Sequence, residues 1–228
     1  MRPAAWIRPD WPAPVGVHAF VTTRDIDLGA SAGGRGEILG RLPSTPRWMK
    51  QVHGAVVADL DLASTAAPTA DAAVTATPGT VAVVLTADCL PVLLCDDRGR
   101  RVGIAHAGWR GMAAGVIENT VRALDADPAR VIAWLGPAIG PRAFEVGEDV
   151  REAFMQVDRG AEAAFAPRGG GKYLADLYAL ARQRLSRSGV TRVTGGDFCT
   201  FGEPERFFSY RRGGEPGRMG AFIWREAA

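Results

Sequence analysis

Short apolar runs separated by polar breaks dominate the middle of the chain and predict buried β-strands. Val81–Leu85 and Pro91–Cys95 flank one polar break, and a third run, Val102–Ala105, ends at His106. Apolar runs of this length between turn residues are typical of strands covered on both faces. Similar patterns predict further strands at Val15–Thr23, Val56–Leu60, Ala72–Thr75, Val131–Leu135, Arg192–Thr194 and Met219–Trp224.

Three other segments carry apolar residues at the period of a helix, three to four residues apart. Two of them are Met112–Leu124 and Val146–Phe154. The clearest is Leu174–Ser188, which is followed by Gly189 as a stop signal. Segments without a clear period are expected to be loops or connections: Asp25–Gly40, Ala63–Thr80, Arg159–Lys172 and Phe198–Arg212.

The order of these elements predicts a fold of the mixed α/β (α+β) class. Strands and helices alternate without an internal repeat or linker, so we expect one domain covering residues 1–228. A chain of this length can bury a full hydrophobic core. No segment is apolar for long enough to span a membrane, and the N-terminal residues lack the apolar core of a signal peptide.

Charge and cysteine content indicate which partners the protein binds and in which compartment it works. The chain has 27 Lys and Arg against 25 Asp and Glu, and it has no basic run, so we expect no nucleic-acid partner. The odd number of cysteines, three, argues against a disulfide framework and favours a reducing compartment. We therefore expect a cytoplasmic protein. Cys95, inside the run VLLC, fits a small buried hydrophobe.

Two histidines and a cysteine stand out as candidates for chemistry. His53 and His106 follow short apolar runs, and Cys89 lies in the break between two predicted strands. Two imidazoles and a thiolate are donors that a catalytic zinc uses, with the fourth position left for water. The three lack the short spacings of a zinc motif. Two alternatives stay open: unrelated packing residues, or a metal-free pair in which Cys89 is the nucleophile and His106 its base.

Other polar residues flank these candidates. Asp88 directly precedes Cys89, and Arg110 lies four residues after His106. A buried arginine at that place would hold a phosphate or carboxylate by two parallel contacts, or it would brace the turn. Tyr210 and Arg211 belong to a second aromatic and basic cluster, which is either a ligand-binding surface or a solvated face.

Seven segments together resemble one known family. They are QVHG, DAAVT, TADCLPVLL, AHAGWRG, GPAIGPRAFEVGEDV, LADLYALARQRL and the pair SYRR…GRMGAFIW. With these, the chain resembles the YfiH-like laccase-domain family, also called the multicopper polyphenol oxidoreductase family. The resemblance implies a fold with mixed sheets flanked by helices, similar to the catalytic domain of cytotoxic necrotising factor. It also implies a metal centre formed by His53, Cys89 and His106.

The activity implied by the resemblance is that of a zinc-dependent purine nucleoside phosphorylase. Adenosine, inosine or 5′-methylthioadenosine would react with phosphate to release the base and leave ribose 1-phosphate or its 5′-methylthio counterpart. Adenosine deaminase would be a side activity, using water activated by the metal, and Asp88 is the candidate acid. Arg110 is the candidate for phosphate, and Arg24 a weaker one. Tyr210 and Arg211 are further candidates for substrate binding, and we expect a monomer or homodimer.

Three other functions stay open under the same resemblance. Copper at the same site would make a polyphenol oxidase, although three histidines cannot furnish the several centres of a multicopper enzyme. The others are a peptidoglycan-precursor editing or binding factor and a metal-free Cys–His hydrolase. The chain departs from the family pattern in a shortened N-terminal segment around Arg24 and in Phe201, where the family usually has tyrosine.

Overall fold

The apolar runs of the middle of the chain form a six-stranded mixed sheet. The structure is a computed structural model that describes residues 6–29, 33–62 and 66–227. The strand order is β12-β8-β6-β7-β4-β3, antiparallel in the centre and parallel in the outermost pair at each edge. Its strands are β3 (Val57–Asp59), β4 (Ala72–Thr75), β6 (Leu90–Asp96), β7 (Val102–Ala107), β8 (Val131–Leu135) and β12 (Arg192–Gly195).

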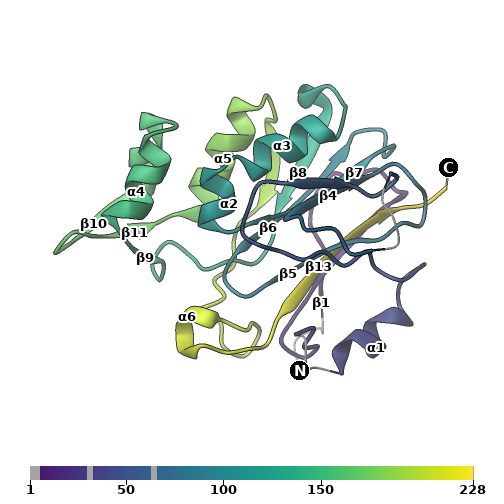
Figure 1. Cartoon of the computed structure of the whole chain (residues 1–228), viewed down its shortest axis with the longest axis horizontal. Coiled ribbons are helices and arrows are strands. Elements are labelled where there is room, and N and C mark those ends of the chain that lie inside the picture. The colour runs from purple at the N-terminus through teal and green to yellow at the C-terminus, as the bar shows by residue number, and fades with distance from the viewer. Residues whose placement is uncertain (1–5, 30–32, 63–65, 228) are drawn as a thin grey trace.

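A second sheet of four antiparallel strands packs against the first (Figure 1). Its order is β1-β2-β13-β5. The last strand along the sequence, β13, therefore lies between β2 and β5, which do not pair with each other. These strands are β1 (Trp6–Ile7), β2 (Val17–Thr22), β5 (Ala82–Thr86) and β13 (Met219–Arg225).

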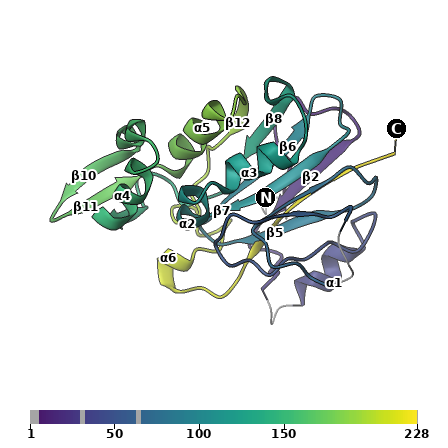
Figure 2. The same cartoon turned by 45° about the horizontal axis from the view of Figure 1, so that its top comes forward.

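The alternation of side chains along β6 explains why its sequence is apolar throughout. Leu93 and Cys95 pack into the core between the two sheets, whereas Val92 and Leu94 pack against helices on the other face. The outer face of the four-stranded sheet is covered through Ile38 of α1 (Gly34–Leu39). The layers are therefore helices, six-stranded sheet, four-stranded sheet and α1 (Figure 2).

Three helices cover the six-stranded sheet: α2 (Trp109–Ala113), α3 (Val116–Ala123) and α5 (Leu177–Arg187). The single helix predicted from Met112 is instead interrupted at Gly115, whose φ of 92° is left-handed and ends the helical path. Helix α5 begins three residues later than predicted. Its start is fixed by the side chain of the N-cap residue Asp176, which accepts a hydrogen bond from an amide of the first turn.

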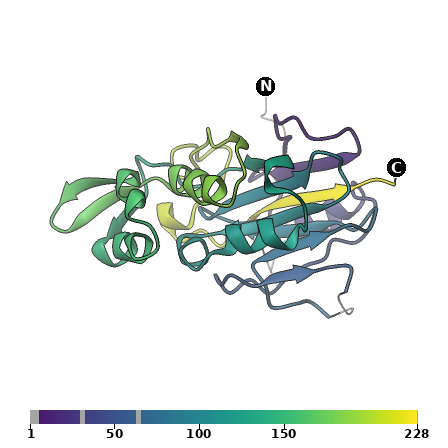
Figure 3. The ribbon, with the colours of Figure 1, turned by 90° about the horizontal axis from the view of Figure 1, so that it is seen from above.

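A small third sheet with one helix projects from the body (Figures 1 and 3). Its strand order is β10-β11-β9, and α4 packs beside it. Its elements are β9 (Glu145–Gly147), α4 (Glu148–Met155), the 3₁₀ helix η2 (Arg159–Ala164), β10 (Phe165–Gly169) and β11 (Lys172–Ala175). The loop predicted over residues 159–172 is therefore wrong for most of its length.

Two further loop predictions are wrong in part. The segment 25–40 contains α1, and the segment 198–212 ends in α6 (Tyr210–Gly213). Residues 30–32 and 63–65, within predicted connections, lie outside the described residues. Helices as short as these depend on tertiary contacts that the local sequence pattern does not reveal. One further short helix, η1 (Pro128–Arg130), directly precedes β8.

The expected mixed α/β class is confirmed by this arrangement. Of the helices in the described part of the chain, none has the length and apolar character needed to cross a bilayer.

Candidate metal centre

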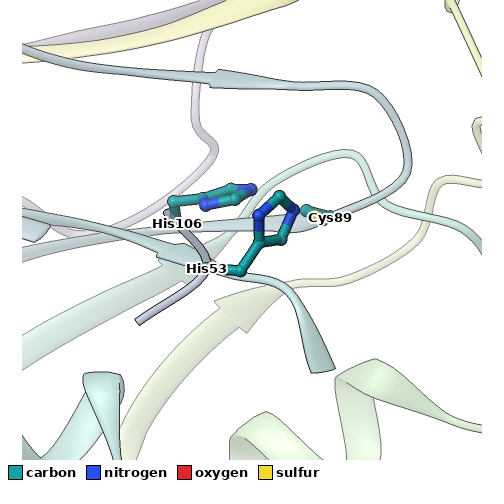
Figure 4. A group of neighbouring side chains, drawn as sticks. All are labelled: His53, Cys89 and His106. Carbon is teal, nitrogen blue, oxygen red and sulfur yellow. The ribbon is translucent and has the colours of Figure 1, made fainter. Parts of the chain in front are cut away.

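The fold brings His53, Cys89 and His106 together at one end of β6 and β7 (Figure 4). Cys89 directly precedes β6, and the pairing of Leu90 with Ala107 places it beside the end of β7, where His106 lies. His53 reaches the same point from the loop before β3. The ligand atoms of the three side chains all lie within 4.8 Å of one another. His53 is exposed, Cys89 half-buried and His106 buried.

Two glycines of the AHAGWRG segment make this close packing possible. A Cβ on Gly108 would lie 2.7 Å from Sγ of Cys89, and a Cβ on Gly111 would lie 2.7 Å from the carbonyl oxygen of Gly54. Any larger residue at either place would push α2 away from the His53 loop or from the thiol. The glycines therefore serve close approach of the backbone.

Asp71 is a residue of the site that sequence analysis missed. Its side chain is fully buried, and the residue directly precedes β4. One oxygen accepts from the backbone N–H of His53 (2.9 Å) and lies 2.9 Å from Nδ1 of His106; the other accepts from Val52 (3.1 Å) and Gly54 (2.8 Å). The DAAVT segment was a signal for this residue, because an aspartate that opens a buried strand needs partners.

The hydrogen bonds of Asp71 decide its charge. Burial alone would raise the pKa of this carboxyl, but the bonds from His106 and from the amides of Gly54 and Val52 lower the pKa to about 2. Asp71 is therefore ionised at neutral pH and accepts a hydrogen bond from Nδ1–H of His106. This leaves Nε2 of His106 for the cluster.

Cys89 and His106 shift each other's pKa in opposite directions. Burial would raise the pKa of the Cys89 thiol, yet the charge and hydrogen bond of His106, and then those of His53, lower it to about 6. Burial would lower the pKa of His106, but Cys89 and Asp71 raise it. Without a metal, the pair is a thiolate beside an imidazolium. Such a thiolate is both a metal ligand and a nucleophile.

The carboxylate of Asp88 is already engaged on both oxygens. It accepts a hydrogen bond from Oγ1 of Thr200 at 2.6 Å and from the backbone N–H of Arg211 at 2.8 Å. Asp88 itself has a left-handed φ of 85°. It connects the turn that carries Cys89 to the C-terminal segment, which makes it a poor candidate for the proton donor.

A cleft of about 730 Å³ opens over the cluster. It is basic, since its lining in the described chain contains several arginines and one carboxylate, that of Asp88. Three aromatic residues also line it. The arginines are Arg35, Arg110, Arg211 and Arg218, and the aromatic residues are Trp109, Phe144 and Tyr210.

The arginines proposed for substrate lie in different surroundings. Arg110 is exposed and stacks on Trp109, with 4.3 Å from its guanidinium carbon to the ring centroid, so the expectation of a buried arginine is wrong. Arg211 lines the cleft and donates to the carbonyl of Glu145 at 2.7 Å. Arg24 is not among the cleft residues.

Arg24 is held elsewhere. Its guanidinium donates to the carbonyl of Pro204, lies 3.7 Å from a carboxylate oxygen of Glu215 and covers the ring of Phe208. Tyr210, in contrast, lies at the cleft and is 63% exposed. The structure thus brings Arg110, Tyr210 and Arg211 to the cluster and leaves Arg24 outside.

A family model described as multi-copper polyphenol oxidoreductase laccase matches residues 36–226. The chain belongs to this family. The resemblance read from the sequence motifs is therefore confirmed. The description of the family names copper, and the donor atoms of the His53–Cys89–His106 cluster are suited to a metal ion.

Curated relatives carry a different activity in their names. Purine nucleoside phosphorylase YfiH of Escherichia coli is 51% identical over 96% of this chain and 98% of its own length. A purine nucleoside phosphorylase of Pseudomonas aeruginosa is 46% identical, also over 96% of this chain and 98% of its own.

Solved structures of the family agree with the fold. A Neisseria meningitidis protein has a TM-score of 0.93 at 43% identity, with 98% of this chain and all of that chain covered. YlmD from Geobacillus stearothermophilus has a TM-score of 0.86 at 27% identity, with 100% and 98% covered.

Proposed function

We propose that this chain is a metal-dependent purine nucleoside phosphorylase. The observation that carries the proposal is the His53–Cys89–His106 cluster at the base of a basic cleft, in a chain whose near full-length relatives bear that name. The substrates would be adenosine, inosine or 5′-methylthioadenosine together with phosphate. A cleft of about 730 Å³ is within the range of sites for small molecules.

The donor set fits zinc. Two imidazole nitrogens and one thiolate are three protein ligands, the number that leaves a fourth position open in catalytic zinc sites. Tetrahedral zinc places such donors about 3.3–3.8 Å apart, so ligand atoms that already lie within 4.8 Å need only a small inward shift. When bound, the metal would supply a Lewis acid at the base of the cleft.

The arginines of the cleft suit an anionic co-substrate. In phosphorolysis a phosphate oxygen forms a bond to C1′ of the ribose while the bond from C1′ to the purine nitrogen breaks and its electrons leave with the base. Arg110 is exposed to the cleft and free to bind phosphate oxygens through parallel N–H groups. Arg211 and Tyr210 would contact the nucleoside from α6. We include adenosine deamination by a cleft water as a side activity of the same site.

The copper-oxidase reading is less well supported by the donor atoms. The chain has three histidines, and His18 pairs with Glu226 at 2.8 Å on the far sheet. Among the described residues only one group of three metal-ligating side chains comes together. A single copper fits this group, but the several centres of a multicopper oxidase do not.

A second candidate function has one specific observation in its favour. The pKa of Cys89 is lowered to about 6 beside His106, which is the arrangement of a cysteine nucleophile with its base. In that case the protein would be a metal-free Cys–His hydrolase, and a chelator would leave its activity unchanged.

The test combines metal content with product analysis on the purified, tag-free protein. Mass spectrometry measures bound metal, and chromatography follows base release from adenosine and inosine with and without phosphate. About one zinc per chain and phosphate-dependent base release are the expected result. Base release that ignores phosphate and chelator would reject the proposal in favour of the hydrolase, and stabilisation by a uridine-linked muramyl compound alone would favour the editing factor.

A further inference from the structure

The loop that carries His53 has an unfavourable conformation that something must hold. His53 has a φ of 60°, in the left-handed region that is unfavourable for a residue with a Cβ atom. Its side chain is exposed and so is that of Val52. The three successive amides of Val52, His53 and Gly54 nevertheless converge on the two oxygens of Asp71. This buried carboxylate is what offsets the strain.

The same carboxylate fixes the second histidine. The backbone carbonyl of Asp71 accepts from the amide of His106 at 2.7 Å, and its side chain lies 2.9 Å from Nδ1 of the ring. The ring is thereby held from the strand side, with its other nitrogen toward Cys89. The two imidazoles end 4.9 Å apart between centroids, at an interplanar angle of 68°. Among the described residues no other carboxylate contacts either histidine.

We propose that Asp71 is the positioning residue of the cluster, setting His53 through its backbone and His106 through its ring before any ligand binds. This role rests on the proposed metal site, although it concerns geometry and not the reaction. One carboxylate then controls two of the three donors, so its loss should disturb both together. Carboxylates that orient metal-binding histidines are worth about 10- to 100-fold in metal affinity.

The first test uses the wild-type protein after its metal has been removed with a chelator. Hydrogen–deuterium exchange is followed at the amides of residues 52–54. We expect exchange at least about tenfold slower than that of an exposed coil, because these amides donate to a buried acceptor although the loop is at the surface. Exchange at the coil rate would show that the loop is not set in advance and would overturn the proposal.

The second test compares Asp71→Asn with a matched control. The asparagine keeps the shape but turns an N–H₂ group toward amide donors. Asp61 lies beside the other end of β4 and accepts hydrogen bonds from the hydroxyl of Thr75 and from the backbone amides of Ala76 and Thr77. Asp61→Asn therefore removes the same kind of clamp away from the cluster. Circular dichroism checks that both variants are folded.

Zinc affinity is measured by competition with a chromophoric chelator, and cobalt substitution reports the thiolate and imidazole ligands by absorption. We expect Asp71→Asn to bind zinc about 10- to 100-fold more weakly, with an altered cobalt spectrum, and Asp61→Asn to stay within about twofold. Unchanged affinity and spectrum in folded Asp71→Asn would overturn the proposal. Asp71→Glu should recover part of the affinity if the charge and bonds matter.

These results are separable from those for the proposed function. Protected amides at residues 52–54 and weakened zinc binding in Asp71→Asn would support the positioning role even if the wild type released no base from nucleosides. Phosphorylase activity together with unprotected amides at residues 52–54 would support the proposed function and reject the positioning role.

Discussion

Two thiols six residues apart, one directly before β6 and one near its far end, have opposite chemistry. Cys89 precedes β6 and has its pKa lowered to about 6, whereas Cys95, near the other end, has its pKa raised to about 12. Burial pushes the pKa of both upward. The difference comes from the neighbours: two imidazoles face Cys89, while Cys95 packs in the core between the sheets with Asp96 beside it. Reactivity in this fold is therefore set at the strand end, where loops deliver charged partners.

The largest expected effect is in alkylation. At pH 7 the thiolate fraction of the two groups should differ by about five orders of magnitude, given their pKa values. In chelator-treated protein, iodoacetamide should label Cys89 and leave Cys95 unmodified, as mass spectrometry of peptides can show. Prior addition of zinc should protect Cys89. Equal labelling of both thiols in folded protein would contradict the difference described here.

His106→Ala should make Cys89 resemble Cys95. The substitution removes the group that lowers the thiol pKa most, so the pH midpoint of Cys89 alkylation should move upward. Loss of one of three donors should weaken metal binding by more than the about 10- to 100-fold that partners of the ligands contribute, and activity should fall with it. The matched control is His18→Ala on β2, a histidine outside the cluster that pairs with Glu226. Full activity of His106→Ala without bound metal would reject the metal site.

The Asp71 carboxylate, which lies beside the Cys89 end of β6, should make the free energy of unfolding depend on pH in the acidic range. The pKa of Asp71 is about 2 in the folded chain and about 3.9 in an unfolded one. Because the folded pKa is the lower, the unfolded chain binds more protons as the pH falls. About 2 kcal/mol of unfolding free energy is therefore present above pH ~5 and lost by pH ~2. Urea titrations should show this loss in the wild type and not in Asp71→Asn.

The smallest effect is expected from Tyr178→Phe, which touches neither thiol. The buried hydroxyl of Tyr178 accepts from the amide of Ala138 and contacts the carbonyls of Gly136 and Phe198. The loop it holds also donates from Ile139 to the carbonyl of Asp88, next to Cys89. Losing the hydroxyl should cost about 1–2 kcal/mol in thermal or chemical unfolding. We expect zinc affinity to stay within about threefold of the wild type, because the lost hydrogen bonds lower stability without touching a ligand. A larger change in zinc affinity would show that this loop also positions the cluster.

The sequence predicted the central strands well because β4, β6, β7 and β8 are buried on both faces along their whole length. An apolar run such as Pro91–Cys95 indicates a buried strand, because helices cover one of its faces and the second sheet covers the other. The helices were predicted less well, since a continuous period hid the left-handed turn at Gly115. The hairpin of β10 and β11 follows from pairing with β9, which no local pattern shows.

The site divides in the same way. Short apolar runs and the break between two of them pointed to His53, Cys89 and His106, and the family motifs strengthened the case for a metal site. Asp71 was overlooked because its role depends on the pairing of β4 with β7 and on a loop that folds back over it. The exposure of Arg110 was also not foreseeable, because a small turn between glycines gives no sign of which side chain faces outward.

The central place of β13 has a consequence for synthesis of the chain on the ribosome. Because β13 separates β2 from β5, the second sheet stays open until residues 219–225 have emerged, long after Cys89 and both histidines have left the exit tunnel. During that interval the thiol is without its finished surroundings. The cleft residues Pro216 and Arg218, which shortly precede β13, can therefore take their places at the cleft only when this strand is inserted.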